Sequence, residues 1–157
     1  MKFYHKQPIE AEQFDCSDDM FNHYGLIDRG GHIVDGLHVD NMCFIPTLEG
    51  QMKINLHDWI ATGVSGEHWA ISDDVFKKTY AELPVIPKAV ADWINKCKND
   101  GISIGDMLCS ERRPEKMRDW MALTPGTYDF NQRRYAEHQE LVARAWLDGY
   151  VVEEEHD

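Results

Sequence analysis

The sequence lacks most of the features that mark a specialised class of protein. Its 157 residues contain only four cysteines and no CxxC pair: Cys16, Cys43, Cys97 and Cys109. This spacing favours reduced thiols over a disulfide framework. No apolar run approaches the roughly 20 residues of a membrane-spanning helix, and no signal-peptide pattern opens the chain. We therefore expect a cytoplasmic protein that does not enter a membrane.

Basic residues are also scarce. Lysine and arginine total 16 against 28 acidic residues, which gives a net charge of −12. Nucleic-acid binders normally carry a basic excess, because phosphate contacts supply much of their affinity. The charge balance therefore argues against broad nucleic-acid binding and leaves open a protein partner with a basic surface. The acidic tail, residues 153–157, is expected to be a solvated end.

Common catalytic motifs are missing as well. The sequence contains no Walker loop, GxGxxG, GxSxG or HExxH motif, so it predicts none of the sites that these motifs build. The glycine-rich residues 29–32 follow no strand-to-helix signal, and we expect a hairpin turn there instead of a phosphate cradle. The sequence therefore predicts neither an enzyme nor a cofactor.

The first half of the chain consists of short apolar runs separated by turns. Residues 48–50 and 63–66 lie between such runs and predict two hairpins, since glycine supplies the positive φ that tight turns often need. Residues 72–74 place a capping oxygen and negative charge at the start of a helix. Together these patterns predict an antiparallel, barrel-like β-meander with one or two helices over residues 1–83.

The second half changes to the helical period after Pro84 and Pro87, which stiffen the boundary. One apolar face of a first helix is formed by residues three and four apart: Ile86, Ala89, Val90, Trp93, Ile94 and Cys97. Further helices are predicted at residues 102–108, from Pro114 onward and at 131–148, with a strand at 150–152. The chain is thus predicted to be α+β, with a small helical domain over residues 84–157.

Several segments of the first half resemble a known family. They are residues 2–11 (KFYHKQPIEA), 45–50 (IPTLEG), 56–67 (LHDWIATGVSGE) and 74–80 (DVFKKTY). They are similar to the PGDYG-type proteins encoded in phages and prophages of Gram-positive bacteria, although Leu56-His57 stands where that family usually has Pro-Gly. The resemblance implies a phage origin and no particular chemistry.

The second half resembles another phage family. Residues 86–94 (IPKAVADWI) and 142–153 (VARAWLDGYVVE) are similar to the two ends of a phage domain of unknown function. That family is known by its sequence pattern and phage context. The resemblance therefore implies a genome neighbourhood and leaves the activity open.

Charged residues and aromatic rings are the candidate binding groups. Acidic pairs at two predicted helix starts either contact a basic partner or only stabilise their helices. Two tryptophans in neighbouring strands either pair across the sheet or form a recognition surface, and one arginine pairs with a carboxylate or a ligand phosphate. In that order, these residues are Asp18 and Asp19, Asp73 and Asp74, Trp59 and Trp69, and Arg144.

The two resemblances favour a non-catalytic phage or prophage accessory protein. It would bind a host or defence component with a basic surface, in the bacterial cytoplasm. The alternative is a small ligand- or metal-binding protein, for sequestration or a minor hydrolysis, that uses His57, Asp58, Glu67 and His68. In this alternative His57, Asp58 and His68 are the metal ligands, if the hairpins bring them together.

Overall fold

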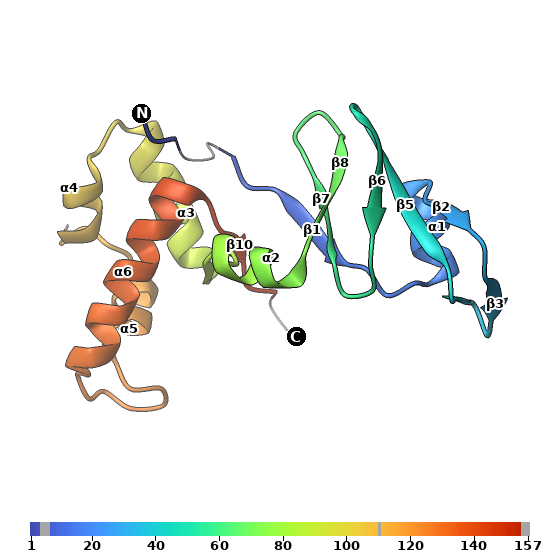
Figure 1. Cartoon of the computed structure of the whole chain (residues 1–157). Helices are drawn as coiled ribbons and strands as arrows, with labels where there is room; N and C mark the ends of the chain where they lie inside the picture. The colour runs from blue at the N-terminus through green and yellow to red at the C-terminus, as the bar shows by residue number, and fades with distance from the viewer. Residues whose placement is uncertain (4–6, 110, 155–157) are drawn as a thin grey trace. The chain divides into compact units, whose positions relative to one another are not determined.

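The computed structural model describes residues 1–3, 7–109 and 111–154. Residues 4–6 of the N-terminal resemblance and 155–157 of the acidic tail lie outside this range. The chain divides into two compact units, Ile9–Ala81 and Met1–Pro8 together with Glu82–Asp157. We call them the β unit and the helical unit (Figure 1). The N-terminal residues group with the helical unit, where Pro8 lies beside Gly149.

The β unit contains two three-stranded sheets, a small hairpin and two helices. The first sheet has the order β1 (Glu10–Gln13), β7 (Trp59–Thr62), β8 (His68–Ile71), and the second has the order β2 (Ile27–Arg29), β5 (Met42–Thr47), β6 (Gly50–Ile54). The hairpin and helices are β3 (His32–Val34), β4 (Leu37–Val39), α1 (Asp18–Tyr24) and α2 (Asp73–Thr79). All these strand pairs are antiparallel. The α+β prediction is confirmed, but the sheets do not close into a barrel.

Two of the three predicted hairpin turns are confirmed. Residues 48–49 connect β5 to β6, and residues 63–67 connect β7 to β8. The prediction of a hairpin turn at residues 29–32 is wrong. Residues 30–31 connect β2 to β3, but β2 pairs with β5 while β3 pairs with β4. The turn between β3 and β4 is Asp35-Gly36, with φ of 49° and 77°. Both residues thus adopt the left-handed conformation that a two-residue type I′ hairpin requires.

Neither three-stranded sheet is a simple meander. Each consists of a local hairpin joined by a strand from earlier in the chain, β1 beside β7 and β2 beside β5. Their buried side chains form one core with α1, and that core contains Phe14, Met20, Phe21, Cys43, Ile45, Ile54 and Ile60.

Within its described residues, the helical unit contains four helices, in agreement with the periodicity of the sequence. They are α3 (Lys88–Asn99), α4 (Ile104–Cys109), α5 (Glu115–Ala122) and α6 (Gln132–Asp148). Prolines precede two of them at the N-cap, Pro87 for α3 and Pro114 for α5. Four residues of the predicted apolar face line the core from α3: Val90, Trp93, Ile94 and Cys97. The prediction is wrong for Ala89, since Ala91 is buried there instead, and Ile86 reaches the core from the segment before α3. Trp93 donates a hydrogen bond from Nε1 to the carbonyl oxygen of Met107 at 3.2 Å.

The predicted terminal strand exists as β10 (Val151–Val152), but its partner was not predicted. It pairs in parallel with β9 (Val85–Ile86), which lies directly after Pro84. The boundary segment therefore contains a short strand as well as a proline-rich linker. Among the residues that the structure describes, no helix is long and apolar enough to cross a bilayer.

Independent folding of the two halves stays a prediction, and limited proteolysis tests it. Residues 80–84 have no regular structure, and Ala81 and Glu82 are exposed. We expect a Glu-specific protease to cut first after Glu82 and to leave two fragments that keep their circular dichroism spectra. A Glu82→Gln variant should lose this early cut. Fragments that unfold once separated would contradict independence.

Candidate functional site

Three of the four candidate acidic residues are held by neighbouring side chains. Asp18 Oδ1 lies 2.8 Å from His38 Nε2, Asp73 Oδ2 lies 2.7 Å from Lys77 Nζ, and Asp74 Oδ2 lies 2.9 Å from Lys78 Nζ. The fourth, Asp19, is exposed on the first turn of α1. The pairs of α2 are ordinary i,i+4 contacts on a helix surface, which contribute little to stability.

Trp59 and Trp69 lie on one face of the first sheet but not directly opposite each other. Their direct partners are Ile71 and Ala61, so the tryptophans are diagonal neighbours. Trp59 is half-buried, stacks on Phe76 with ring centroids 4.1 Å apart, and donates from Nε1 to Asp73 Oδ1 at 2.9 Å. These contacts fix the start of α2 against the sheet.

The residues of the alternative metal site lie at opposite ends of the β7–β8 hairpin. His57 and Asp58 precede β7, whereas Glu67 and His68 lie where β8 begins. The four residues of β7 separate the two pairs by about 13 Å, at ~3.3 Å per residue. In the described part of the chain, no three His, Cys, Asp or Glu side chains are grouped to hold a metal ion. Arg144 is exposed on α6.

His38 is the most constrained polar group of the β unit. Its ring nitrogens lie 2.8 Å from Asp18 Oδ1 and 2.7 Å from Asp28 Oδ2, and its ring stacks on Phe21 with centroids 3.6 Å apart. Asn41 Nδ2 donates a hydrogen bond to the same oxygen of Asp28. The His38 side chain is only 7% exposed. This cluster ties the β3–β4 hairpin to α1 and β2.

The two carboxylates favour the protonated form of His38. Burial lowers the pKa of His38, but the hydrogen bonds and charges of Asp28 and Asp18 raise it more, so the net pKa is above its ordinary value. A ring with both nitrogens hydrogen-bonded to carboxylates is a poor general base, because neither nitrogen is free to accept a proton. The arrangement is that of a structural clamp.

A cavity of about 390 Å³ lies beside this clamp. Its walls are mostly apolar, and its polar side chains come from β4 and from the loops before α1 and after β4. The lining residues are Phe14, Asp15, Cys16, Leu37, His38, Val39, Asp40, Asn41, Cys43, Ile54 and Leu56. An apolar cavity with a few polar groups is a common form of binding site. Asp15 stays ionised there, because the Ser17 side chain lowers the pKa of its carboxyl.

The two thiols in this cavity are poor nucleophiles. Burial raises the pKa of Cys43 to about 11 and also raises the pKa of Cys16. The thiolate is the reactive form of cysteine, so both side chains stay protonated and inert near neutral pH. The cavity is therefore better suited to binding than to covalent catalysis.

The β3–β4 hairpin exposes apolar side chains next to the cavity. Ile33, Val34 and Leu37 are 54%, 45% and 46% exposed. The hairpin is nevertheless fixed, because Asp18 N donates to Gly36 O and His38 N donates to Cys16 O, both at 2.9 Å. Val34 and Leu37 are direct cross-strand partners and lie on one face of the hairpin, whereas Ile33 lies on the other face with His38. We call Val34 and Leu37, together with Leu56 at 52% exposure in the cavity wall, the hairpin face. A rigid apolar surface loses little entropy when a partner binds.

Sequence reasoning did not find the hairpin face. The Asp35-Gly36 dipeptide between apolar residues is a strong hairpin signal and could have located the turn. It would also have placed His38 opposite Ile33 on the paired strand. The contacts of His38 with α1 and β2 depend on tertiary packing, which no local pattern reports.

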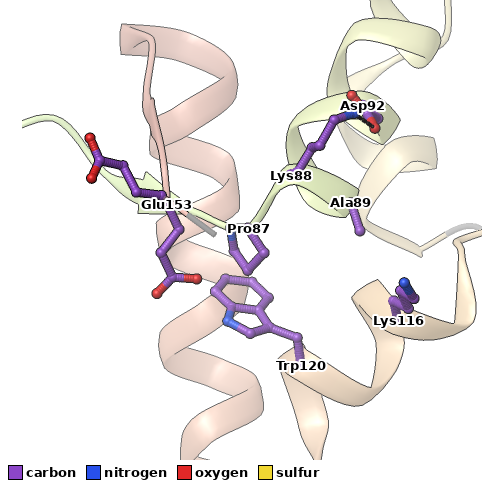
Figure 2. A pocket seen from close by; sticks show the side chains of 8 residues that line it. Pro87, Lys88, Ala89, Asp92, Lys116, Trp120 and Glu153 are labelled. Carbon is purple, nitrogen blue, oxygen red and sulfur yellow. Dashed lines mark hydrogen bonds and ion pairs between the residues drawn. The ribbon is translucent and has the colours of Figure 1, made fainter. Parts of the chain in front are cut away.

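A second cavity of about 390 Å³ lies in the helical unit. It is lined by Pro87, Lys88, Ala89, Asp92, Lys116, Trp120, Glu153 and Glu154. Figure 2 shows Pro87 beside the Trp120 ring, with Glu153 on one side and Lys116 on the other. Lys88 Nζ lies 2.6 Å from Asp92 Oδ2. Because charges of both signs line this cavity, it favours no charge class of ligand.

Comparison with known protein families finds a match for the second half of the chain. Residues 81–157 match the family model described as a protein of unknown function (DUF1642). This is a phage-associated domain of unknown function, so the resemblance of the second half is confirmed. No curated protein and no solved structure matches the chain. The PGDYG-type resemblance of the first half stays a prediction.

Proposed function

We propose that this is a non-catalytic phage accessory protein that acts by binding a protein of the infected bacterium. The hairpin face is the binding surface, and the observation that carries the proposal is its combination of exposed apolar side chains with a fixed backbone. Apolar residues of this kind usually pack inward, and clusters that stay exposed mark interaction sites. The match of residues 81–157 to the phage-associated DUF1642 family supports a phage origin.

The chemistry of the same region supports binding over catalysis. The His38 ring is held at both nitrogens by carboxylates, and the nearby thiols are protonated. A catalytic His or Cys needs an unblocked nitrogen or a lowered thiol pKa. In this proposal the protein modulates a host or defence component in the cytoplasm by covering part of that component's surface.

Paired variants test this function in infected cells. We expect Val34→Ser/Leu37→Ser to reduce recovery of the bound partner at least tenfold, because central apolar residues dominate interface energy. The matched control is Leu48→Ser/Val64→Ser, which changes two even more exposed apolar residues in other turns of the β unit. The measurement is quantitative mass spectrometry after affinity purification with each variant.

Two outcomes would contradict the proposal. One is a partner that the hairpin variant retains at the wild-type level. The other is turnover of a nucleotide, peptide or sugar library by the purified protein that is abolished by His57→Ala or His68→Ala. That result would instead favour the alternative site at the β7–β8 hairpin.

A further inference from the structure

The acidic charge of the chain is concentrated in the β unit. Residues 9–81 contain 13 acidic and 4 basic side chains, a net charge of −9, whereas the whole chain carries −12. The hairpin face lies within this unit. Asp15 and Asp40 line the cavity, and Asp35 forms the hairpin turn. Two carboxylates therefore line the apolar cavity, and a third lies in the turn of the hairpin that carries the apolar side chains.

From this arrangement we infer that the hairpin face binds a basic peptide segment, in which one large apolar side chain enters the cavity and flanking lysines or arginines contact Asp15, Asp35 and Asp40. The inference rests on the proposed function and names the chemistry of the partner. It combines two independent features of the surface, the apolar cavity wall and the charge around it.

The apolar anchor follows from the walls of the cavity. Leu37, Val39 and Leu56 line the same space as the buried Phe14 and Ile54. An apolar side chain that enters this space leaves water for an apolar environment, which contributes roughly 25 cal/mol per Å² of buried apolar surface. A charged side chain would lose its hydration against these apolar walls, because the two carboxylates of the lining, Asp15 and Asp40, are exposed and do not lie among the buried residues.

The basic flanks follow from electrostatic complementarity. A second copy of this chain is a poor occupant, because two units of charge −9 repel each other. An acidic or neutral segment gains nothing from the three carboxylates. A segment with lysines or arginines is attracted before contact, which raises its association rate at low salt.

Two positions allow the charge to be removed without disturbing the fold. Asp35 and Asp40 have φ of 49° and 56°, and asparagine tolerates this left-handed conformation at least as well as aspartate. Asp35→Asn also creates the Asn-Gly pair that type I′ turns prefer. The double variant Asp35→Asn/Asp40→Asn should therefore fold normally. The matched control is Glu49→Gln/Asp74→Asn, which removes two exposed carboxylates elsewhere in the β unit.

The test is selection of a displayed library of random nonapeptides on the wild-type protein, followed by fluorescence anisotropy of the selected peptides. We expect a consensus with one large apolar residue flanked by at least two lysines or arginines. Asp35→Asn/Asp40→Asn should weaken its binding at least threefold, an effect that shrinks at high salt, while the control pair changes it less than twofold. Leu37→Ser should weaken it at least tenfold.

The outcomes separate this inference from the proposed function. If the selected peptides are uncharged or acidic and Leu37→Ser still abolishes their binding, the basic partner is ruled out. The hairpin face then remains a binding surface. If neither the charge variants nor the apolar variants change the affinity of the selected peptides, both the basic partner and the hairpin face as a binding surface are ruled out. If no peptide is enriched but partner recovery still depends on Val34 and Leu37, the short peptide segment is ruled out and the hairpin face remains a protein interface.

Discussion

Replacing Phe14 with alanine is expected to lower the free energy of unfolding of the β unit by about 3–5 kcal/mol. The Phe14 side chain is fully buried, and its ring lies 5.8 Å from that of Phe21. It also forms part of the cavity wall, so truncation enlarges an existing space instead of letting the core collapse. The backbone of Phe14 bonds to His57 and Asp58, and alanine keeps those bonds. Urea unfolding followed by tryptophan fluorescence measures the loss.

The matched variant in the helical unit is Met117→Ala. Met117 is fully buried in the other core, and its truncation should cost about 2–5 kcal/mol. If the units fold separately, Phe14→Ala should leave the helical circular dichroism transition in place, and Met117→Ala should shift it. A single transition that both variants shift equally would show that the two cores unfold together.

Replacing His38 with alanine is expected to lower the free energy of unfolding of the β unit by about 2–3 kcal/mol, which is the contribution of a charged hydrogen bond and its packing. This loss applies at pH values below the ordinary histidine pKa of about 6.5. The variant leaves Asp18 and Asp28 without the cation between them and removes the ring that stacks on Phe21. His32→Ala is the control, because His32 is exposed on the same hairpin and should cost less than about 0.5 kcal/mol.

The pH dependence of the His38 effect has a defined sign. The pKa of His38 is raised in the folded protein, so the folded state binds the proton more tightly than the unfolded chain. The stabilisation is complete below the unfolded pKa and is lost as the pH rises through the folded pKa. The stability difference between wild type and His38→Ala should therefore shrink above pH 6.5. A difference that grows with pH would show that the neutral ring is the stabilising form.

The elements that the sequence predicted well are those with strong local signals. The apolar period and the flanking prolines place α3 and α5, and glycine-containing turns place the β5–β6 and β7–β8 hairpins. The pairings of β1 with β7, β2 with β5 and β9 with β10 join residues far apart in the chain. No local pattern reports such pairings, because they depend on which surfaces pack together.

The candidate site depends on the same long-range packing. Asp18 was predicted as an exposed charge at a helix start, but α1 packs beside the hairpin and brings it to His38. Trp59 was predicted to pair directly with Trp69 across the sheet. In the register of β7 and β8 the two residues are instead diagonal neighbours. Residue type indicated a charge at a helix start in the first case and a sheet-stabilising aromatic pair in the second, while tertiary contact and register determined the partners.

Site-specific photocrosslinking tests the central claim most directly, since it asks which face of the β unit contacts a partner. A photoreactive benzoylphenylalanine would replace Val34 in one protein and Val64, which is 72% exposed in another turn, in a second protein. We predict a discrete adduct from position 34 in infected cells that disappears when Leu37→Ser is added or when the selected peptide competes. An adduct that forms equally from position 64, or one that survives Leu37→Ser, would contradict the claim that the hairpin face is the binding surface.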